Sequence, residues 1–499
     1  MSTKSQWSAP HRNAAGLSIA YVLPFLFNIS ARLSHIYTKQ VLPAARRVVL
    51  FLCFIPLFLS LYVEHLAAQV NSVATKDRIV VVISLDGFPA YALDDPKLPL
   101  PTLRRLAKEG ARAEAMVTVN PTVTWPNHTA MVTGVNSAKH SVLYNGLAVR
   151  SEGMPVRVEP WVDKTELVSV PTVYDLAHKA GLTTAEVDWV AIQNAKTITW
   201  SFAERPKPDG GVEREMVSEG LITREDLTGF EKAPITWRDD IWIKACLYIL
   251  RKHRPNLMLF HLLNTDTVQH RYGARSLAAN TALAYADSKV QAILDALAES
   301  ALLEQSTILV VSDHGFKTAK RTIVSNALLR QKGLLREENG KITCDAYVVP
   351  EGGTAMVYVT NESKKAELTN KLKDLFAGVE GVSRVLTPAE FAQFGYPDPK
   401  DNPRMADLVL VARDGYNFSG GLQGEIVRDV NATGSAGSHG YLNTEPEMNA
   451  IFVAWGRGIR KGKRLGTIRN LDVAPTIAAL LGIKMTDIDG RVLTELLIQ

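Results

Sequence analysis

The chain has 499 residues, of which 46% are hydrophobic and 21% are charged, so it contains enough apolar material for a large buried core. Its formal net charge of +5 comes from residues 1–69, which hold six of the 56 Lys and Arg residues and one of the 51 Asp and Glu residues. The rest of the chain therefore has 50 basic and 50 acidic residues, a balance that excludes a generally basic nucleic-acid-binding surface.

The first predicted element is the apolar segment Val48–Val63, which follows Arg46-Arg47 and leads into small residues before Gln69. Charged, apolar and small residues in this order are typical of a secretory signal, and the apolar length is slightly below the ~20 residues that a membrane anchor needs. We therefore predict a signal peptide or membrane anchor at 47–69 behind an N-terminal extension at 1–46. The two arginines favour a cytoplasmic N-terminus, so we expect the following domain to be extracytoplasmic: periplasmic, secreted or membrane-anchored.

From Arg78 onward the pattern predicts alternating strands and helices. The continuous β-branched run Ile79–Leu85 is typical of a strand buried on both faces of a parallel sheet. Such alternation predicts an α/β fold with a mostly parallel central sheet flanked by helices. Further strands are predicted at Thr183–Val187, Leu257–Leu263 and Thr307–Ser312, and helices at Pro101–Gly110, Val173–Ala180, Ile241–Arg251 and Leu283–Leu297.

Between about residues 317 and 435 the pattern changes, with turns rich in Pro and Asp, and we predict a smaller α+β insertion there. Its predicted elements are the strands Thr354–Thr360 and Ala406–Ala412 and the helix Lys364–Phe376. The strand Ala450–Trp455 then returns to the main sheet, followed by the helix Val473–Leu481 before Gly482.

The chain has three cysteines, Cys53, Cys246 and Cys344, and no CxxC pair, which excludes a cysteine-based metal site. A Cys246–Cys344 disulfide and two unpaired buried thiols are both compatible with these positions.

Acidic and imidazole side chains stand where predicted strands end. Asp86 follows the first strand, and Asp313-His314 follows the strand that ends near Ser312. Ligands in open α/β sheets bind at the carboxyl ends of strands, so these residues are candidates for one site. Three carboxylates and three imidazoles suit two divalent metal ions, with Zn²⁺ as the best match. The full candidate set is Asp86, Asp266, His270, Asp313, His314 and His439.

Thr124 is the candidate nucleophile, because a metal pair lowers the pKa of an adjacent hydroxyl. Pro126 fits the first turn of a helix, whose free amides and dipole attract phosphate. We expect the Asn127 amide to donate to a phosphoryl oxygen and His128 to be structural. Thr122 is the nearest rival nucleophile, and Thr124 alternatively caps the helix.

Six stretches of the chain resemble the type I phosphodiesterase/nucleotide pyrophosphatase family of the alkaline phosphatase superfamily. They are VVVISLDGF (80–88), NPTVTWPNHTAMVTG (120–134), DTVQHRYG (266–273), VVSDHGF (310–316), GSHGY (437–441) and LDVAPTIAALLGI (471–483). The resemblance implies an alkaline-phosphatase-like fold and a catalytic domain over residues 77–490.

The resemblance also implies the division of labour within the site. One metal ion would be held by Asp266, His270 and His439, and the other by Asp86, Asp313, His314 and the Thr124 oxygen. It implies metal-dependent hydrolysis of phosphodiester or pyrophosphate bonds in small nucleotide-type substrates through a phosphothreonine intermediate at Thr124, with Asn127 steadying the phosphoryl group.

The chain departs from the family pattern at Asn264-Thr-Asp266, where nucleotide-acting members often have Pro before the Asp and Gly before the His. This puts the substrate pocket in question, and the candidates for stacking a base are Trp125, Tyr144, Trp161 and Trp189. The alternatives are a phosphomonoesterase or phosphonate hydrolase of the same superfamily, or a non-catalytic, metal-stabilised surface binding protein. The last would be expected to have lost a ligand or Thr124, and neither is lost.

Overall fold

The computed structural model describes residues 75–430 and 436–498. The predicted N-terminal extension and the segment 47–69 lie outside these residues. Within the described part of the chain, no helix is both long and apolar enough to cross a lipid bilayer.

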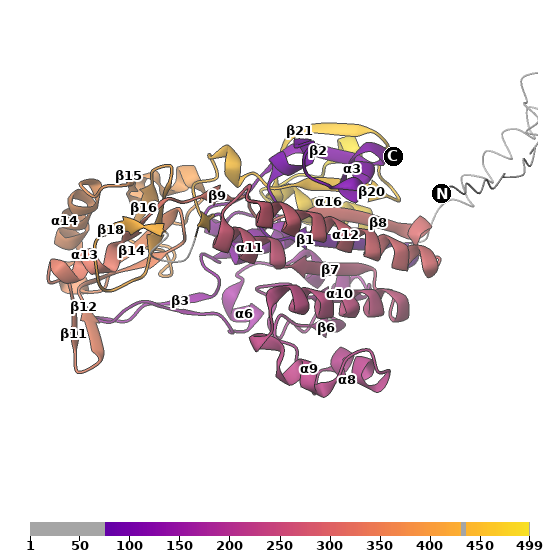
Figure 1. Ribbon diagram of the computed structural model, residues 1–499, viewed down its shortest axis with the longest axis horizontal. Helices are drawn as coiled ribbons and strands as arrows, with labels where there is room; N and C mark the ends of the chain where they lie inside the picture. Colours follow the sequence, from indigo (N-terminus) through magenta and orange to yellow (C-terminus); the bar gives the residue numbers. More distant parts are fainter. Residues whose placement is uncertain (1–74, 431–435, 499) are drawn as a thin grey trace, which may run out of the picture. The chain divides into compact units, whose positions relative to one another are not determined.

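The fold is built on an eight-stranded sheet with the strand order β21-β2-β20-β8-β1-β7-β5-β6 (Figure 1). Strand β20 runs antiparallel to its neighbours β2 and β8, and the other pairs are parallel, which confirms the predicted mostly parallel sheet. The strands are β1 (Ile79–Leu85), β2 (Ala111–Val117), β5 (Thr184–Val187), β6 (Trp200–Phe202), β7 (Leu257–Leu262), β8 (Ser306–Val311), β20 (Phe452–Gly456) and β21 (Lys463–Arg469).

Helices cover both faces of this sheet because its central strands are apolar on both faces. In β1, Val81 and Ile83 belong to one hydrophobic core and Val80 and Val82 to the other. The first core also contains side chains of α3 (Pro101–Glu109), α10 (Ile235–Lys252) and α12 (Leu277–Glu299). The second contains side chains of α4 (Thr124–Thr133), α7 (Val173–Lys179) and α16 (Val473–Leu481).

Two helices are longer than the sequence predicts. Helix α10 begins after Pro234 rather than at Ile241, and α12 begins after Ser276 rather than at Leu283. The hydroxyl of Ser276 accepts a hydrogen bond from the Ala279 N–H and caps α12. Apolar periodicity locates only the stretch that faces the core, so it misses exposed first turns such as the one at Leu277, which is 85% exposed.

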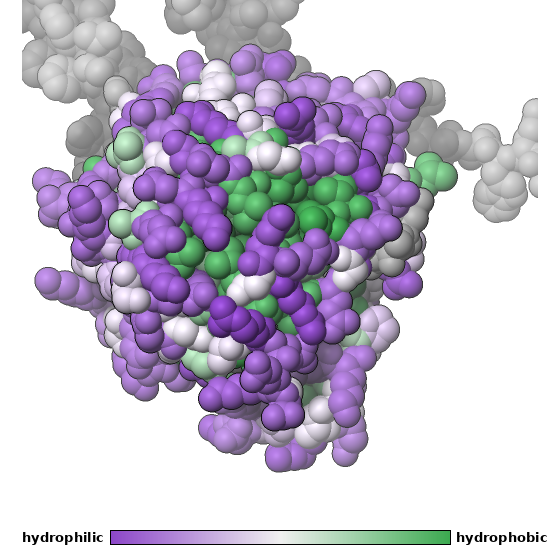
Figure 2. All heavy atoms as spheres, turned by 90° about the vertical axis from the view of Figure 1, so that its left-hand side faces the viewer, coloured by the Kyte–Doolittle hydropathy of each residue, from purple (hydrophilic) through white to green (hydrophobic). Residues whose placement is uncertain are grey.

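The segment between β8 and β20 carries a second, four-stranded antiparallel sheet with the order β13-β14-β16-β15. Helix α14 (Lys365–Ala377) packs on it and shares its hydrophobic core. The side that carries α13 (Ser325–Gln331) and α14 shows an apolar area ringed by polar side chains (Figure 2). The strands are β13 (Ala346–Pro350), β14 (Thr354–Val359), β15 (Val382–Leu386) and β16 (Leu408–Ala412).

The start and end of this segment lie side by side. Strand β19 (Gly437–Ser438) pairs antiparallel with β9 (Lys317–Thr318), so residues on both sides of the long excursion meet. The pairing brings His439, which follows β19, back to His314, which precedes β9; their rings stack with centroids 3.8 Å apart.

The remaining elements are shorter or lie at the periphery. They are β3 (Leu147–Val149), β4 (Arg157–Glu159), α5 (Ser137–His140), α6 (Lys164–Leu167), α8 (Gly211–Ser218), α9 (Arg224–Thr228), α11 (Asn264–Tyr272), β10 (Arg321–Val324), α13 (Ser325–Gln331), β11 (Leu335–Glu338), β12 (Lys341–Cys344), α15 (Pro388–Phe391), β17 (Tyr416–Ser419) and β18 (Val427–Asp429). Cys246 in α10 and Cys344 in β12 are buried free thiols, so the disulfide left open by the sequence is not formed.

Candidate active site

The predicted metal ligands meet at the carboxyl ends of three neighbouring strands. Asp86 follows β1, and Asp313-His314 follows β8 beside it. On the other side of β1, strand β7 leads into α11, which carries Asp266 and His270 one helical turn apart. The helical turn predicted for these two residues is therefore present, and it places both side chains on one face.

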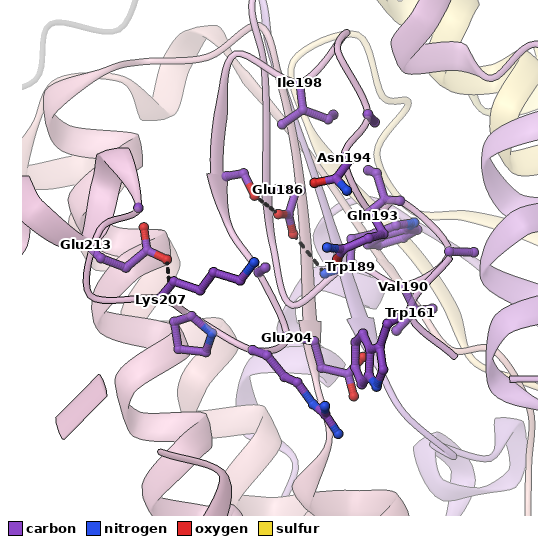
Figure 3. A pocket seen from close by; sticks show the side chains of 18 of the residues that line it. Trp161, Glu186, Trp189, Val190, Gln193, Asn194, Ile198, Glu204, Lys207 and Glu213 are labelled. Atoms are coloured by element: carbon purple, nitrogen blue, oxygen red, sulfur yellow. Dashed lines mark hydrogen bonds between the residues drawn. The ribbon is translucent and has the colours of Figure 1, made fainter. Parts of the chain in front are cut away.

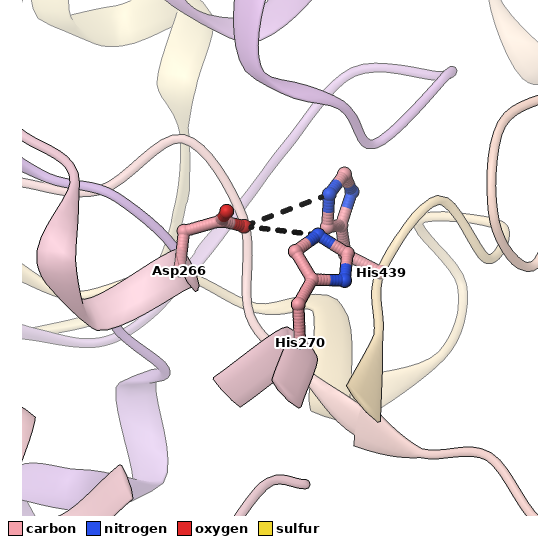
Figure 4. Close-up of side chains that lie close together, drawn as sticks. All are labelled: Asp266, His270 and His439. Carbon is pink, nitrogen blue, oxygen red and sulfur yellow. Dashed lines mark ion pairs between the residues drawn. The ribbon is translucent and has the colours of Figure 1, made fainter. Parts of the chain in front are cut away.

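Asp266, His270 and His439 form the first cluster (Figure 4). The Asp266 Oδ1 atom lies 3.3 Å from His270 Nε2 and 3.7 Å from His439 Nε2. One carboxylate oxygen thus faces two imidazole nitrogens from different parts of the chain, an arrangement that suits a divalent ion.

The second cluster joins Asp86, Asp266 and His314, whose ligand atoms also lie close together. The His314 Nε2 atom is 3.4 Å from Asp86 Oδ1 and 3.2 Å from Asp313 Oδ2. Asp266 takes part in both clusters, so the two candidate metal positions are adjacent.

Four of the atoms that face the clusters are buried and have no hydrogen-bond partner within residues 75–430 and 436–498. A buried polar atom left without a partner is costly, and a bound cation would satisfy all four. The donor set therefore fits divalent metal ions. The atoms are Asp86 Oδ1, Asp266 Oδ1, Asp313 Oδ2 and His314 Nε2.

Backbone carbonyls orient the three imidazoles. The Nδ1 atoms of His270, His314 and His439 lie 3.1, 3.1 and 3.0 Å from the carbonyl oxygens of Gly437, Gly315 and Thr122. A carbonyl only accepts, so each Nδ1 carries the proton and each Nε2 keeps its lone pair toward the cluster.

The pKa values reflect the crowding of like groups. Burial and the neighbouring carboxylates of Asp313 and Asp266 raise the pKa of Asp86 well above its ordinary value. Burial raises the pKa of Asp266, but the imidazoles of His270 and His439 outweigh it and bring the pKa below its ordinary value. Burial lowers the pKa of His314 to about 4, and burial together with His314 lowers that of His439. These two imidazoles are therefore neutral near pH 7, which is the ligand form.

Two glycines allow the backbone to approach this centre. A Cβ atom at Gly315 would lie 1.9 Å from the Glu447 carbonyl oxygen. The backbone beside His314 can therefore lie this close to Glu447 only because residue 315 is a glycine. At Gly440 the backbone has φ +76°, and a Cβ atom would lie 1.5 Å from the Glu351 carbonyl oxygen.

Thr124 is the first residue of α4, and its hydroxyl has no hydrogen-bond partner in the described residues. Val123 is the N-cap and makes no side-chain capping bond, so Thr124 does not cap the helix. The rival Thr122 is fully buried, and its hydroxyl donates to the Tyr441 carbonyl at 2.6 Å. The His128 Nδ1–H donates to the Thr124 carbonyl at 2.9 Å, and the same nitrogen lies 3.8 Å from Asp313 Oδ2, so the first turn of α4 lies next to Asp313.

The role predicted for Asn127 is not compatible with this geometry. Its Nδ2 group donates to the carbonyls of Pro121 and Val123 at 3.0 and 2.9 Å, and its Oδ1 accepts from Val119 N–H and Asn470 Nδ2, both at 2.8 Å. The side chain is fully buried, so its amide holds the turn before α4 and has no donor left for a phosphoryl group.

Asn145 offers the amide that sequence reasoning missed. Its Oδ1 accepts a hydrogen bond from the Trp125 N–H at 2.9 Å, and the residue is exposed. The bond uses the carbonyl oxygen and leaves the Nδ2 group available beside the first turn of α4. No sequence signal marks this residue, because it lies 21 positions from Thr124 in a loop and only the fold brings it there.

Comparison with known proteins then places this geometry in a family. The sequence model of the family "Type I phosphodiesterase / nucleotide pyrophosphatase" matches residues 80–442, a range that includes every predicted site residue. The chain belongs to this family. It is therefore a hydrolase of the phosphodiesterase and nucleotide pyrophosphatase class, as the resemblance implied.

The chain is similar to full-length relatives at low identity. It is 23% identical to human ectonucleotide pyrophosphatase/phosphodiesterase family member 7 over 434 residues, which cover 86% of this chain and 85% of the relative. It is 24% identical to the Xenopus laevis bis(5'-adenosyl)-triphosphatase enpp4 over 422 residues, 81% of this chain and 78% of the relative.

Solved structures of the family share the fold. Inactive murine ectonucleotide pyrophosphatase/phosphodiesterase 5 in complex with AMP superposes with a TM-score of 0.64 at 20% identity, covering 84% of this chain and all of that one. The α/β fold with a mostly parallel sheet predicted from the sequence is thus that of its family.

A pocket of about 670 Å³ lies near the start of α4 and includes Trp161, Glu186 and Trp189 in its lining (Figure 3). Trp125, which follows Thr124, and Trp161 both line it, with ring centroids 6.2 Å apart. The guanidinium of Arg205 stacks over Trp161 at 3.9 Å and pairs with Glu231 at 3.0 Å. Of the other aromatic candidates, Tyr144 is buried against Tyr358. Trp189 also lines the pocket, but its ring is almost fully buried and packs on His128.

The wall of the pocket contains a buried carboxyl group, Glu186. It accepts hydrogen bonds from the Ser201 hydroxyl and from the Trp189 N–H, but burial raises its pKa to about 7. The folded state therefore binds a proton that the unfolded state releases near its ordinary pKa. The stability of the fold should fall as pH rises from about 4.5 to 7.

Replacing Glu186 with glutamine should remove this pH dependence. With a divalent metal ion saturating in both proteins, we expect the wild type to lose up to about 3 kcal/mol more than Glu186→Gln in unfolding free energy between about pH 5 and pH 8. Urea unfolding at the two pH values measures this difference. Equal losses in the two proteins would show that Glu186 does not titrate in this range.

Proposed function

We propose that this family member is a two-metal enzyme, with Zn²⁺ at both positions, that hydrolyses phosphodiester or pyrophosphate bonds of nucleotide-type substrates through a phosphothreonine intermediate at Thr124. The observation that carries the proposal is the set of four buried, unpartnered ligand atoms contributed by Asp86, Asp266, Asp313 and His314. Chain segments far apart in sequence leave these atoms facing one another, and divalent cations are the ligands that suit them.

The residues divide between the two ions as the resemblance implies. Asp266, His270 and His439 would hold one ion, and Asp86, Asp313 and His314 would hold the other together with the Thr124 oxygen. When bound, the ions lower the pKa of the threonine hydroxyl and offset the charge that develops on phosphorus-bound oxygens.

The reaction would then proceed in two steps, formation of the phosphothreonine at Thr124 and its hydrolysis. Thr124 Oγ1 bonds to phosphorus while the bond from phosphorus to the leaving oxygen breaks, and the leaving group takes up a proton. In the second half water attacks the phosphothreonine and restores the Thr124 hydroxyl. The Asn145 Nδ2 group, which the bond from the Trp125 N–H to Asn145 Oδ1 leaves available, would donate to a phosphoryl oxygen, the role first expected of Asn127.

A nucleotide-type substrate suits the pocket beside Thr124. Trp125 and Trp161 offer aromatic surfaces for a planar group next to the phosphoryl position. The AMP complex of the murine relative and the triphosphatase activity named for the Xenopus relative support the same class. Exported relatives, such as venom phosphodiesterases, also support an extracytoplasmic location. The apolar residues 48–63 would then act either as a signal peptide or as an anchor that holds the enzyme to the membrane.

A phosphomonoesterase or phosphonate hydrolase is the alternative on the same metal core. Monoesterases usually add a cationic side chain for the extra phosphate charge, and the sequence around Thr124, residues 118–134, contains no Lys or Arg. We expect purified Val70–Gln499 to cleave bis-p-nitrophenyl phosphate at least about tenfold faster than p-nitrophenyl phosphate in kcat/KM. Release of p-nitrophenol measures both rates, and the reverse ranking would favour the monoesterase.

A further inference from the structure

A histidine outside the predicted ligand set lies directly behind one of the ligands. His261 is on β7 and is fully buried. Its Nε2 atom is 3.2 Å from Asp86 Oδ2, the carboxylate oxygen on the side away from His314. The other carboxylate oxygen, Asp86 Oδ1, is the unpartnered atom that faces the candidate metal position.

The far side of the His261 ring is held by Asp188. The His261 Nδ1 atom lies 3.1 Å from the Asp188 carbonyl oxygen and 3.3 Å from its Oδ2. Both ring nitrogens therefore face oxygens that accept, so His261 carries a proton on each nitrogen and donates from Nδ1 to Asp188 and from Nε2 toward Asp86. Asp188 follows β5, the strand beside β7, and is fully buried with φ +58°, a left-handed conformation that costs energy for a residue other than glycine. The three side chains Asp86, His261 and Asp188 thus form a row across the ends of three neighbouring strands.

Packing fixes the ring plane as well. The His128 ring meets His261 edge-on with centroids 4.4 Å apart, and the Trp189 ring also packs edge-on against His128, with centroids 4.8 Å apart. Because His128 also donates to the Thr124 carbonyl, the same stack supports the start of α4. Neither His261 nor Asp188 has an atom in the two metal clusters.

We propose that His261, oriented by Asp188, is a positioning residue that donates a hydrogen bond to Asp86 Oδ2 and so aims Asp86 Oδ1 at the metal. The proposal rests on the proposed two-metal function. A carboxylate ligand held by one rotatable bond has two equivalent oxygens, and a fixed donor to one of them sets the orientation of the other. Such supporting hydrogen bonds typically change metal affinity by about 10- to 100-fold.

The test compares His261→Leu, which removes the donor, with His261→Gln, which keeps an N–H donor. Zinc affinity is measured by competition with a chromophoric chelator, and kcat and KM are measured with bis-p-nitrophenyl phosphate. We expect His261→Leu to weaken one of the two zinc ions by about 10- to 100-fold and to lower kcat more than it raises KM. His261→Gln and Asp188→Asn should show smaller changes of the same kind.

His140→Leu is the matched control, because His140 is another fully buried histidine and has no contact with the metal clusters. It should change unfolding free energy without changing zinc affinity. If His261→Leu does not fold, Asp188→Asn carries the test. Zinc affinity within about twofold of wild type in His261→Leu, or in Asp188→Asn where His261→Leu does not fold, would overturn the positioning role. A wild-type protein that binds no zinc would instead overturn the proposed function itself.

Discussion

Thr124→Ala is expected to lower kcat for diester hydrolysis by at least about 10³-fold, because it removes the hydroxyl that we propose as the nucleophile. The zinc content should stay near that of the wild type, since six other side chains provide the remaining ligands. Thr124 is the first residue of α4 and its hydroxyl supports no other group, so the fold should tolerate alanine. Initial rates with bis-p-nitrophenyl phosphate and zinc analysis of the same sample measure both effects.

Thr122→Ser is the matched control for this experiment. It keeps the hydroxyl that donates to the Tyr441 carbonyl, and it should leave kcat within about threefold of wild type. Trapping of the radiolabelled phosphoryl group on acid-quenched wild-type enzyme, and its loss in Thr124→Ala, would identify the covalent intermediate. Near-normal turnover in Thr124→Ala would exclude Thr124 as the nucleophile and return attention to Thr122.

Asp266→Asn should have the second large effect, because Asp266 would hold one ion with His270 and His439 and its carboxylate also lies beside Asp86 and His314 of the second cluster. Losing its charge should weaken both ions, whereas His439→Gln should weaken only the ion held with His270. We expect zinc in Asp266→Asn to fall well below the wild-type content after dialysis, and kcat/KM to fall by about 10³-fold.

The same substitution should remove the stabilisation that zinc gives to the fold. A ligand present at 100 times its dissociation constant stabilises a protein by about 2.7 kcal/mol, so added zinc should raise the melting temperature of the wild type more than that of Asp266→Asn. The matched control is Asp287→Asn, a buried carboxylate that instead accepts from the Thr102 and Leu103 N–H groups at the start of α3. Asp287→Asn should have a lower unfolding free energy than the wild type and should keep its zinc. Equal zinc content in the wild type, Asp266→Asn and Asp287→Asn would contradict the role of Asp266 in metal binding.

The sequence by itself predicted the features that depend on local pattern. The β-branched run Ile79–Leu85 predicted a doubly buried central strand with its correct bounds, and the apolar stretch Val473–Leu481 predicted a helix that the structure places at the same residues. It also predicted the six acidic and imidazole residues that the fold brings together. Carboxylates at the ends of strands and the order of the motifs can be recognised from the sequence alone.

Only the tertiary structure decided which polar groups remain available for chemistry. Asn127 and Asn145 are the same residue type, but the turn before α4 occupies every hydrogen-bonding position of Asn127, whereas the loop at Asn145 leaves its amide nitrogen without a partner among the described residues. Likewise, His261 looks in the sequence like an ordinary strand residue, and its position between Asp86 and Asp188 follows from the order of β1, β7 and β5 in the sheet. Whether a polar group already has hydrogen-bond partners, and which strands are neighbours, depends on residues far apart in the sequence. The local sequence pattern therefore cannot predict either.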